Sequence, residues 1–75
     1  MRIQPLSDNM VERSIKLVQG VFPNDDSNFI RKTIEGSLDM KKHAEFFNSL
    51  KCTGVKYWVA VDGDKVIGIT GLWLC

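Results

Sequence analysis

The sequence predicts an α+β fold with a short N-terminal strand, two or three helices and then an antiparallel β-hairpin. Two β-rich runs, Tyr57–Val61 and Val66–Leu72, flank the turn Asp62-Gly63-Asp64. Asp-Gly between apolar runs is a strong hairpin signal, because glycine adopts positive φ without a Cβ clash. Between residues 9 and 50, apolar residues recur at helical spacing. Helices in this order are expected to cover one face of a small sheet.

The N-terminal segment Arg2–Leu6 alternates in polarity and predicts the first strand. Ile3 and Pro5 lie on one side of it, opposite Arg2 and Gln4. Because proline has no N–H to donate, this strand is expected to lie at a sheet edge or to end there.

The first helix is expected to begin near Asn9, although Ser7 and Asp8 are also N-cap candidates. Asn9 followed three residues later by Glu12 has the form of a capping box. The helix is expected to end near Gly20–Phe22, with Pro23 beyond it as a stop signal. Its apolar stripe consists of Val11, Ile15, Val18 and Phe22.

Asp25, Asp26 or Ser27 can cap a second helix, which Gly36 is expected to weaken or end. Its apolar stripe runs through Phe29 or Ile30, Thr33 or Ile34, and Leu38. A third helical segment is indicated by Met40, His43 or Ala44, Phe47 and Leu50. The run Lys51–Gly54 then predicts a helix exit or turn before the hairpin.

A length of 75 residues allows one domain at most. The net charge is +1 and no basic block stands out, which argues against nucleic acid or an anionic membrane as the main partner. The longest apolar run, Val66–Cys75, reaches about half a membrane span. The N-terminus lacks the apolar core of a signal peptide, so a cytoplasmic location is expected.

The two cysteines, Cys52 and Cys75, are expected to be reduced thiols, one buried and one near a terminus. Together with His43, the only histidine, they cannot supply the four closely paired ligands of a structural zinc site, so no metal is expected. An exposed Cys75 would allow disulfide-linked dimers in vitro.

Other candidates for chemistry have simpler structural explanations. His43 has no nucleophile placed beside it and is expected to be a solvated or half-buried structural residue. The carboxylates of Asp25-Asp26 and Asp62/Asp64 suit helix capping and turn formation. Gly68 and Gly71 lie inside a strand pattern and suggest a bulge or a close backbone approach. Their spacing is not that of a phosphate-binding loop. The aromatic residues Tyr57, Trp58 and Trp73 are expected in a core or interface rather than against nucleobases.

The hairpin and the element order together resemble the N-terminal half of a GNAT-superfamily N-acetyltransferase. Tyr57–Val61 is similar to the first hairpin strand of that family, Asp62–Lys65 to its acidic turn, and Val66–Leu72 to its second strand. The opening Met1–Leu6 is similar to the family's first strand. The resemblance implies that residues 1–75 form one partial domain of an enzyme that transfers acetyl from acetyl-CoA to an amine.

The same resemblance implies that catalytic residues and the acetyl-CoA loop follow in later elements of the family. No residue here matches that loop, so the chain by itself is expected to be inactive and to hold no cofactor. What the resemblance carries over is the lining of the acceptor pocket for a small-molecule or peptide amine: Phe22, Asn24, Asp25, Asp26, Leu72 and Trp73.

A different interpretation makes the chain a small standalone α+β interaction module. Trp73-Leu74-Cys75 is then expected to form an edge that pairs with another chain, since no side chain after Lys65 is charged. Self-association through this C-terminal strand edge is then expected. An enzyme complete in these 75 residues ranks last, because no nucleophile, metal cluster or cofactor loop is visible.

Overall fold

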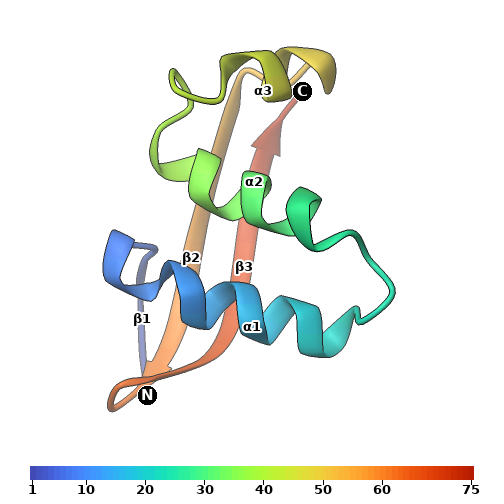
Figure 1. Ribbon diagram of the computed structural model, residues 1–75. Coiled ribbons are helices and arrows are strands. Elements are labelled where there is room, and N and C mark those ends of the chain that lie inside the picture. The colour runs from blue at the N-terminus through green and yellow to red at the C-terminus, as the bar shows by residue number, and fades with distance from the viewer.

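The computed structural model describes all residues, Met1–Cys75, and has the predicted α+β class, with the third helix formed. It has three strands and three α-helices in the predicted order, and Figure 1 shows how they are arranged. The elements are β1 (Arg2–Pro5), a short 3-10 helix η1 (Asp8–Met10), α1 (Val11–Val21), α2 (Ser27–Leu38), α3 (Ala44–Ser49), β2 (Gly54–Asp62) and β3 (Lys65–Leu74).

The sheet is antiparallel throughout, with β2 in the centre and β1 and β3 at its two edges. Asp62 pairs with Lys65, so the hairpin turn is the two residues between them, and Gly63 has a φ of 63°. The predicted hairpin is therefore confirmed, with strands longer than expected. The pairing also shifts register between Ala60 and Val61, which leaves Ile67 without a partner in a β-bulge.

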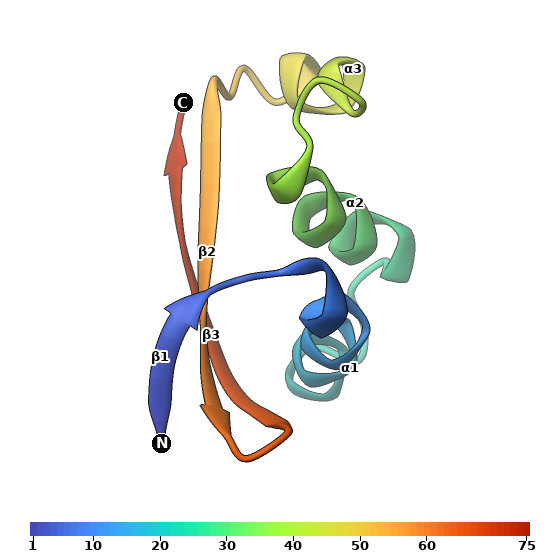
Figure 2. The same ribbon diagram turned by 90° about the vertical axis from the view of Figure 1, so that its left-hand side faces the viewer.

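All helices pack on one face of this sheet, as Figure 2 shows from the side. The molecule is only 18 Å across in its shortest dimension, which leaves room for one helical layer and one sheet. Alternation along β2 sends Val55, Val59 and Val61 toward the helices. The opposite face is uncovered, and the apolar side chain of Ile3 is exposed there.

Two apolar clusters fill the space between the layers. The larger one joins β2 to both long helices, and the smaller one lies at the far end, under α3. The larger consists of Leu6, Val11, Ile15, Ile30, Ile34, Val59 and Val61, and the smaller of Phe47, Cys52 and Val55. Tyr57 of β2 packs against both, so a single strand links the two parts of the core.

The end of α1 at Val21 and the start of α2 agree with prediction, but the start of α1 does not. The Asp26 side chain accepts a hydrogen bond from the backbone N–H of Asn28 at 2.9 Å and so caps α2. The capping box predicted for Asn9 and Glu12 does not form, because η1 precedes α1 and Asn9 accepts a hydrogen bond from Ser7. The carboxylate of Glu12 is instead bound by Arg31 of α2.

Gly36 does not end α2, which continues to Leu38. A Cβ atom at Gly36 would lie 2.6 Å from a ring carbon of Phe47, so this glycine lets α2 and α3 approach closely. The predicted turn after α3 is present. Lys51 there adopts a φ of 58°, and the next residue, Cys52, donates its N–H to the carbonyl of Phe47.

Candidate functional site

An apolar groove of about 280 Å³ lies between the last turns of α1 and the first half of β3. Its floor is backbone and side chain of β3, and its wall is the end of α1. It is lined by Leu17, Val18, Val21, Phe22, Ile67, Gly68 and Ile69. The groove is apolar because the stripe of α1 continues through Val18 to Phe22 beside β3, where Ile67 lies in the bulge.

The groove runs beside the free edge of the sheet. β3 pairs with β2 on one side only, so backbone groups along its other side have no strand partner. The strand contains no proline, and Lys65 at its start is its only charged residue. Natural edges are usually protected by charge, proline or a covering element. The free edge of β3 and the adjoining groove together form the candidate site.

Of the residues predicted to line an acceptor pocket, Phe22 lies in this groove. Asn24, Asp25 and Asp26 follow in the exposed loop that joins α1 to α2. The backbone N–H of Asp25 donates to the carbonyl of Phe22 at 3.1 Å, which closes a turn. Since Asp26 caps α2, the Asp25 carboxylate is the one in this loop without a structural role.

Leu72 and Trp73 lie at the other end of β3, away from Phe22. Leu72 pairs with Lys56 on the uncovered face and is 58% exposed. Trp73 points toward the helices, where its ring packs against Phe47 and its Nε1 donates to the Tyr57 hydroxyl at 3.0 Å. The structure thus places Phe22 against Ile67–Ile69 and separates it from this second pair.

Ile67 and Ile69 are not among the site residues that the sequence predicts. The signal was present, because two isoleucines flank Gly68 in a strand that lacks charge. Their faces were not predictable, since the bulge at Ile67 changes the alternation of the strand.

His43 lies just before α3, half-buried, between two polar hollows. Its imidazole makes no hydrogen bond to a serine, cysteine or carboxylate. The first hollow combines four carboxylates with Lys42, and the second combines three lysines, Lys42 among them, with Glu45. These charges surround His43 without giving it the oriented partner that nucleophilic catalysis needs.

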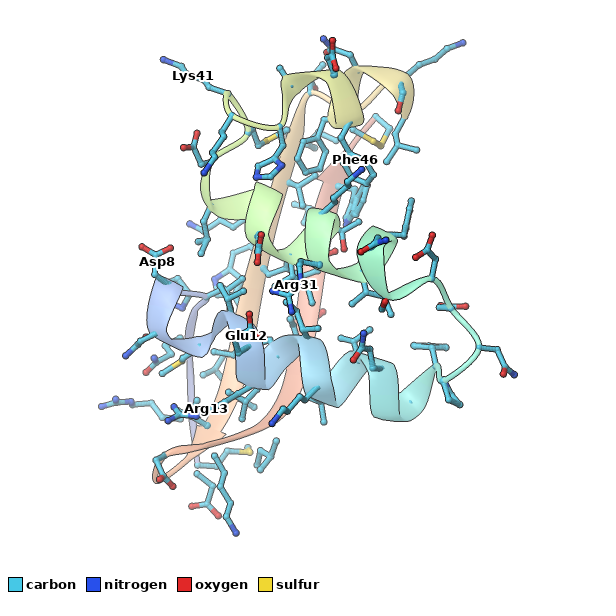
Figure 3. The ribbon with its side chains drawn as sticks, viewed as in Figure 1. Asp8, Glu12, Arg13, Arg31, Lys41 and Phe46 are labelled. Carbon is cyan, nitrogen blue, oxygen red and sulfur yellow. A yellow bond between two sulfur atoms is a disulfide. The ribbon has the colours of Figure 1, made fainter.

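One ion-pair cluster joins the two long helices on the exposed side. Arg31 of α2 donates both Nη atoms to the Glu12 carboxylate of α1, at 2.5 and 3.1 Å, and also pairs with Glu35 at 2.8 Å. Figure 3 shows Glu12 and Arg31 facing each other across the helices. The hydrogen bonds from Arg31 lower the pKa of Glu12, and those from Arg31 to Glu12 and Glu35 raise the pKa of Arg31.

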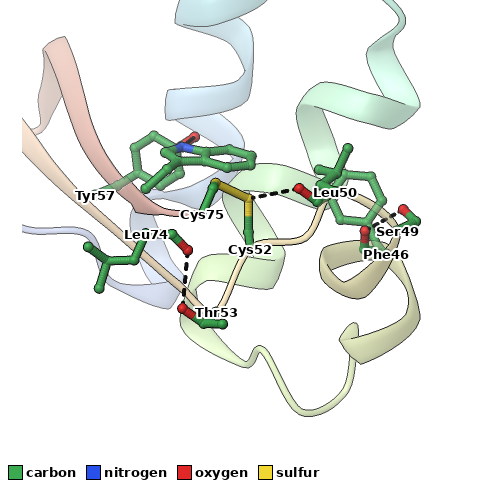
Figure 4. Close-up of a disulfide and its surroundings, with 9 residues drawn as sticks. Phe46, Ser49, Leu50, Cys52, Thr53, Tyr57, Leu74 and Cys75 are labelled. Atoms are coloured by element: carbon green, nitrogen blue, oxygen red, sulfur yellow. Dashed lines mark hydrogen bonds between the residues drawn. A yellow bond between two sulfur atoms is a disulfide. The ribbon is translucent and has the colours of Figure 1, made fainter.

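The expectation of two separate reduced thiols is wrong for this structure: Cys52 and Cys75 form a disulfide. Antiparallel pairing explains the contact, since it brings the residues just before β2 alongside the end of β3. Thr53 donates both its N–H and its hydroxyl to the carbonyl of Leu74 at the same place. Figure 4 shows the disulfide beside α3 and the aromatic side chain of Tyr57.

Comparison of the chain with models of known protein families, with curated proteins and with solved structures gave no match. The fold and the site therefore supply the arguments for function. None of the helices has both the length and the apolar character needed to cross a bilayer.

Proposed function

We propose that these residues form the N-terminal part of a GNAT-type N-acetyltransferase domain, the acceptor side of an enzyme that moves acetyl from acetyl-CoA to an amine. The order of strand, helices and hairpin supports this, as does the antiparallel arrangement β1-β2-β3 with helices on one face. The observation that carries most weight is the position of Phe22, which places the α1–α2 loop beside the free edge of β3. A cytoplasmic location belongs to the same proposal.

In this proposal the whole enzyme uses direct attack of a neutral amine on the thioester, with backbone N–H groups polarising the carbonyl. Those donors and the phosphate-binding loop belong to elements outside residues 1–75. The present residues supply an apolar wall for the acceptor, formed by Phe22, Ile67 and Ile69. The exposed Asp25 carboxylate is positioned to hold a second, positively charged group of a polyamine or peptide acceptor.

Three measurements test this assignment: the reading frame, CoA release, and KM for an amine. A genomic reading frame that continues past residue 75 into a Gly-rich strand–helix unit supports it, and the longer protein should then release CoA from acetyl-CoA when an amine is added. Asp25→Asn should raise KM for a polyamine in that protein, while Asp64→Asn in the hairpin turn should not. Absence of any acetyl-CoA-dependent activity in the longer protein would reject the assignment.

The residues present here lack a phosphate-cradling loop, so they are expected to bind acetyl-CoA weakly when tested alone. Titration calorimetry with acetyl-CoA measures this directly. A dissociation constant of about 10 μM or less, near −7 kcal/mol, would contradict the proposal and point to a different phosphate site.

A second function is favoured by one observation: the free edge of β3 is long, uncharged after Lys65 and bordered by an apolar groove. Such an edge suits antiparallel pairing with β3 of a second copy across a two-fold axis. The chain would then act as a self-associating interaction module. A stop codon directly after residue 75 in the gene would favour this module over the acetyltransferase.

Sedimentation of the disulfide-bonded chain over a wide concentration range tests the module. Leu72→Lys introduces a charge on β3 and should weaken association at least about tenfold, near 1.4 kcal/mol. Ile3→Lys is the matched control, because Ile3 is similarly exposed on β1, the opposite edge. A monomer at high micromolar concentration, or equal effects of both variants, would reject pairing through β3.

A further inference from the structure

The two cysteines of the disulfide lie in different surroundings. Cys52 is 4% exposed and packs in the smaller cluster with Phe47 and Val55, whereas Cys75 is exposed to solvent. Trp73 packs against the same cluster and covers it from the β3 side. A reagent in solution therefore reaches one end of this disulfide more easily than the other.

Thiol–disulfide exchange requires a thiolate to approach the sulfur it attacks, so access decides which sulfur reacts. Leaving-group chemistry alone would favour attack on Cys52, because the departing thiolate would then be Cys75, which is better solvated than the buried Cys52. Attack on Cys52, however, requires the cluster around Phe47 to open. Access is therefore the controlling factor in the folded protein.

We propose that Cys75 is a site of reversible S-thiolation by low-molecular-weight thiols, with Cys52 as its shielded resolving partner. The thiolate of the small molecule attacks Cys75 Sγ, the Cys52–Cys75 bond breaks, and a mixed disulfide forms on Cys75. The electron pair of the broken bond goes to Cys52 Sγ, which takes a proton from water. The carbonyl oxygen of Leu50 lies 3.5 Å from this sulfur, in place to accept the resulting S–H (Figure 4).

The reverse step restores the disulfide. Cys52, after losing its proton, attacks the mixed disulfide at Cys75 and expels the small thiol. Full reduction needs a second equivalent of thiol, which attacks the small-molecule sulfur of the adduct and leaves Cys75 as a thiolate. Cys52 is held near the end of β3 throughout by the hydrogen bonds between Thr53 and the Leu74 carbonyl, so re-closure is intramolecular.

The experiment uses the oxidised full chain and glutathione as the probe. After partial reaction the mixture is acid-quenched and mapped by tandem mass spectrometry. The adduct should lie on Cys75 in at least about tenfold excess over Cys52, because reactivity follows exposure. In concentrated urea the excess should fall toward equality. Absence of the intramolecular disulfide, equal adducts in the folded protein, or an excess unchanged by urea would each overturn the proposal.

Two valine-to-alanine variants distinguish the local burial of Cys52 from a general loosening of the fold. Val55→Ala opens the cluster around Cys52 and should raise the share of adduct on Cys52 several-fold. Val61→Ala removes the same atoms from the other cluster of the same strand and should leave the share unchanged. If both variants change the share equally, global opening controls the exchange and the assignment of Cys75 as the site fails.

Discussion

Gly71 shows how one residue without a side chain fixes the end of the sheet. It pairs with Tyr57, and a Cβ atom at Gly71 would lie 2.4 Å from the Tyr57 ring. The ring lies over the β3 backbone, and its hydroxyl accepts the hydrogen bond from Trp73. The close approach expected for this glycine from its place in a strand is therefore confirmed, and Tyr57 is the group that approaches.

Gly71→Ala should destabilise the protein by about 1 to 3 kcal/mol, because the added methyl overlaps the Tyr57 ring. Urea unfolding monitored by tryptophan fluorescence measures the loss. Gly68→Ala is the matched control on the same strand, since its Cβ would meet only the Cβ of Ala60 at an ordinary 3.6 Å. Equal losses in the two variants would show that strand propensity, and not the Tyr57 contact, is responsible.

Lys51 is a non-glycine residue at a position where the backbone conformation favours glycine. Its φ of 58° lies in the left-handed region, which costs a non-glycine residue about 1 to 2 kcal/mol. Lys51→Gly removes this cost but adds about 0.5 to 1 kcal/mol of backbone entropy loss. A net gain of about 0.5 to 1 kcal/mol in unfolding free energy is expected. Lys51→Ala should give no such gain, and a gain there would attribute the effect to loss of charge.

At the scale of elements, Arg31 ties the faces of α1 and α2 together outside the apolar core. Arg31 lowers the pKa of its partner Glu12, so the ion pair between the helices depends on pH. Because the folded-state pKa of Glu12 lies below its ordinary value of 4.5, the ionised carboxylate stabilises the fold above that value. This stabilisation is lost as the pH falls through the lowered folded-state pKa.

Glu12→Gln should therefore lower the thermal midpoint at neutral pH but leave it close to that of the wild type in strong acid. Thermal unfolding by circular dichroism at both pH values measures the difference. Glu45→Gln is the control, since Glu45 is exposed and makes no ion pair. A Glu12→Gln effect that persists unchanged in acid would show that packing, and not charge, links the helices.

At the scale of the whole molecule, the disulfide closes β2, the turn and β3 into one covalent loop, because it joins two cysteines 23 positions apart in the sequence. Loop-closure entropy for that length corresponds to about 3 kcal/mol, a large part of the stability of so small a domain. Reduction with excess dithiol should lower the unfolding free energy by about this amount, as measured by urea titration. Cys75→Ser, at the exposed end of the disulfide, should match the reduced wild type, and reductant should not affect it further. A reduced wild type as stable as the oxidised form would contradict this account.

Local rules determined much of this protein from the sequence alone. Gly63 specified the hairpin turn, Asp26 the start of α2, and Pro5 an edge strand, because each of these depends on backbone chemistry within a few residues. The apolar spacing of the three helical segments likewise predicted their existence. The capping box at Asn9 does not form because α1 begins only after η1, and Glu12 is bound by Arg31, nineteen residues away.

Tertiary structure decided the rest, because contacts distant in the chain have no local signature. Only the register of β2 against β3 brings Cys52 to Cys75, and only the packing of α3 explains the glycine at Gly36. The candidate site follows the same division. Phe22 was predicted as a site residue, but its neighbours Ile67 and Ile69 depend on a one-residue bulge, and Leu72 and Trp73 point to opposite faces because side chains alternate along a strand.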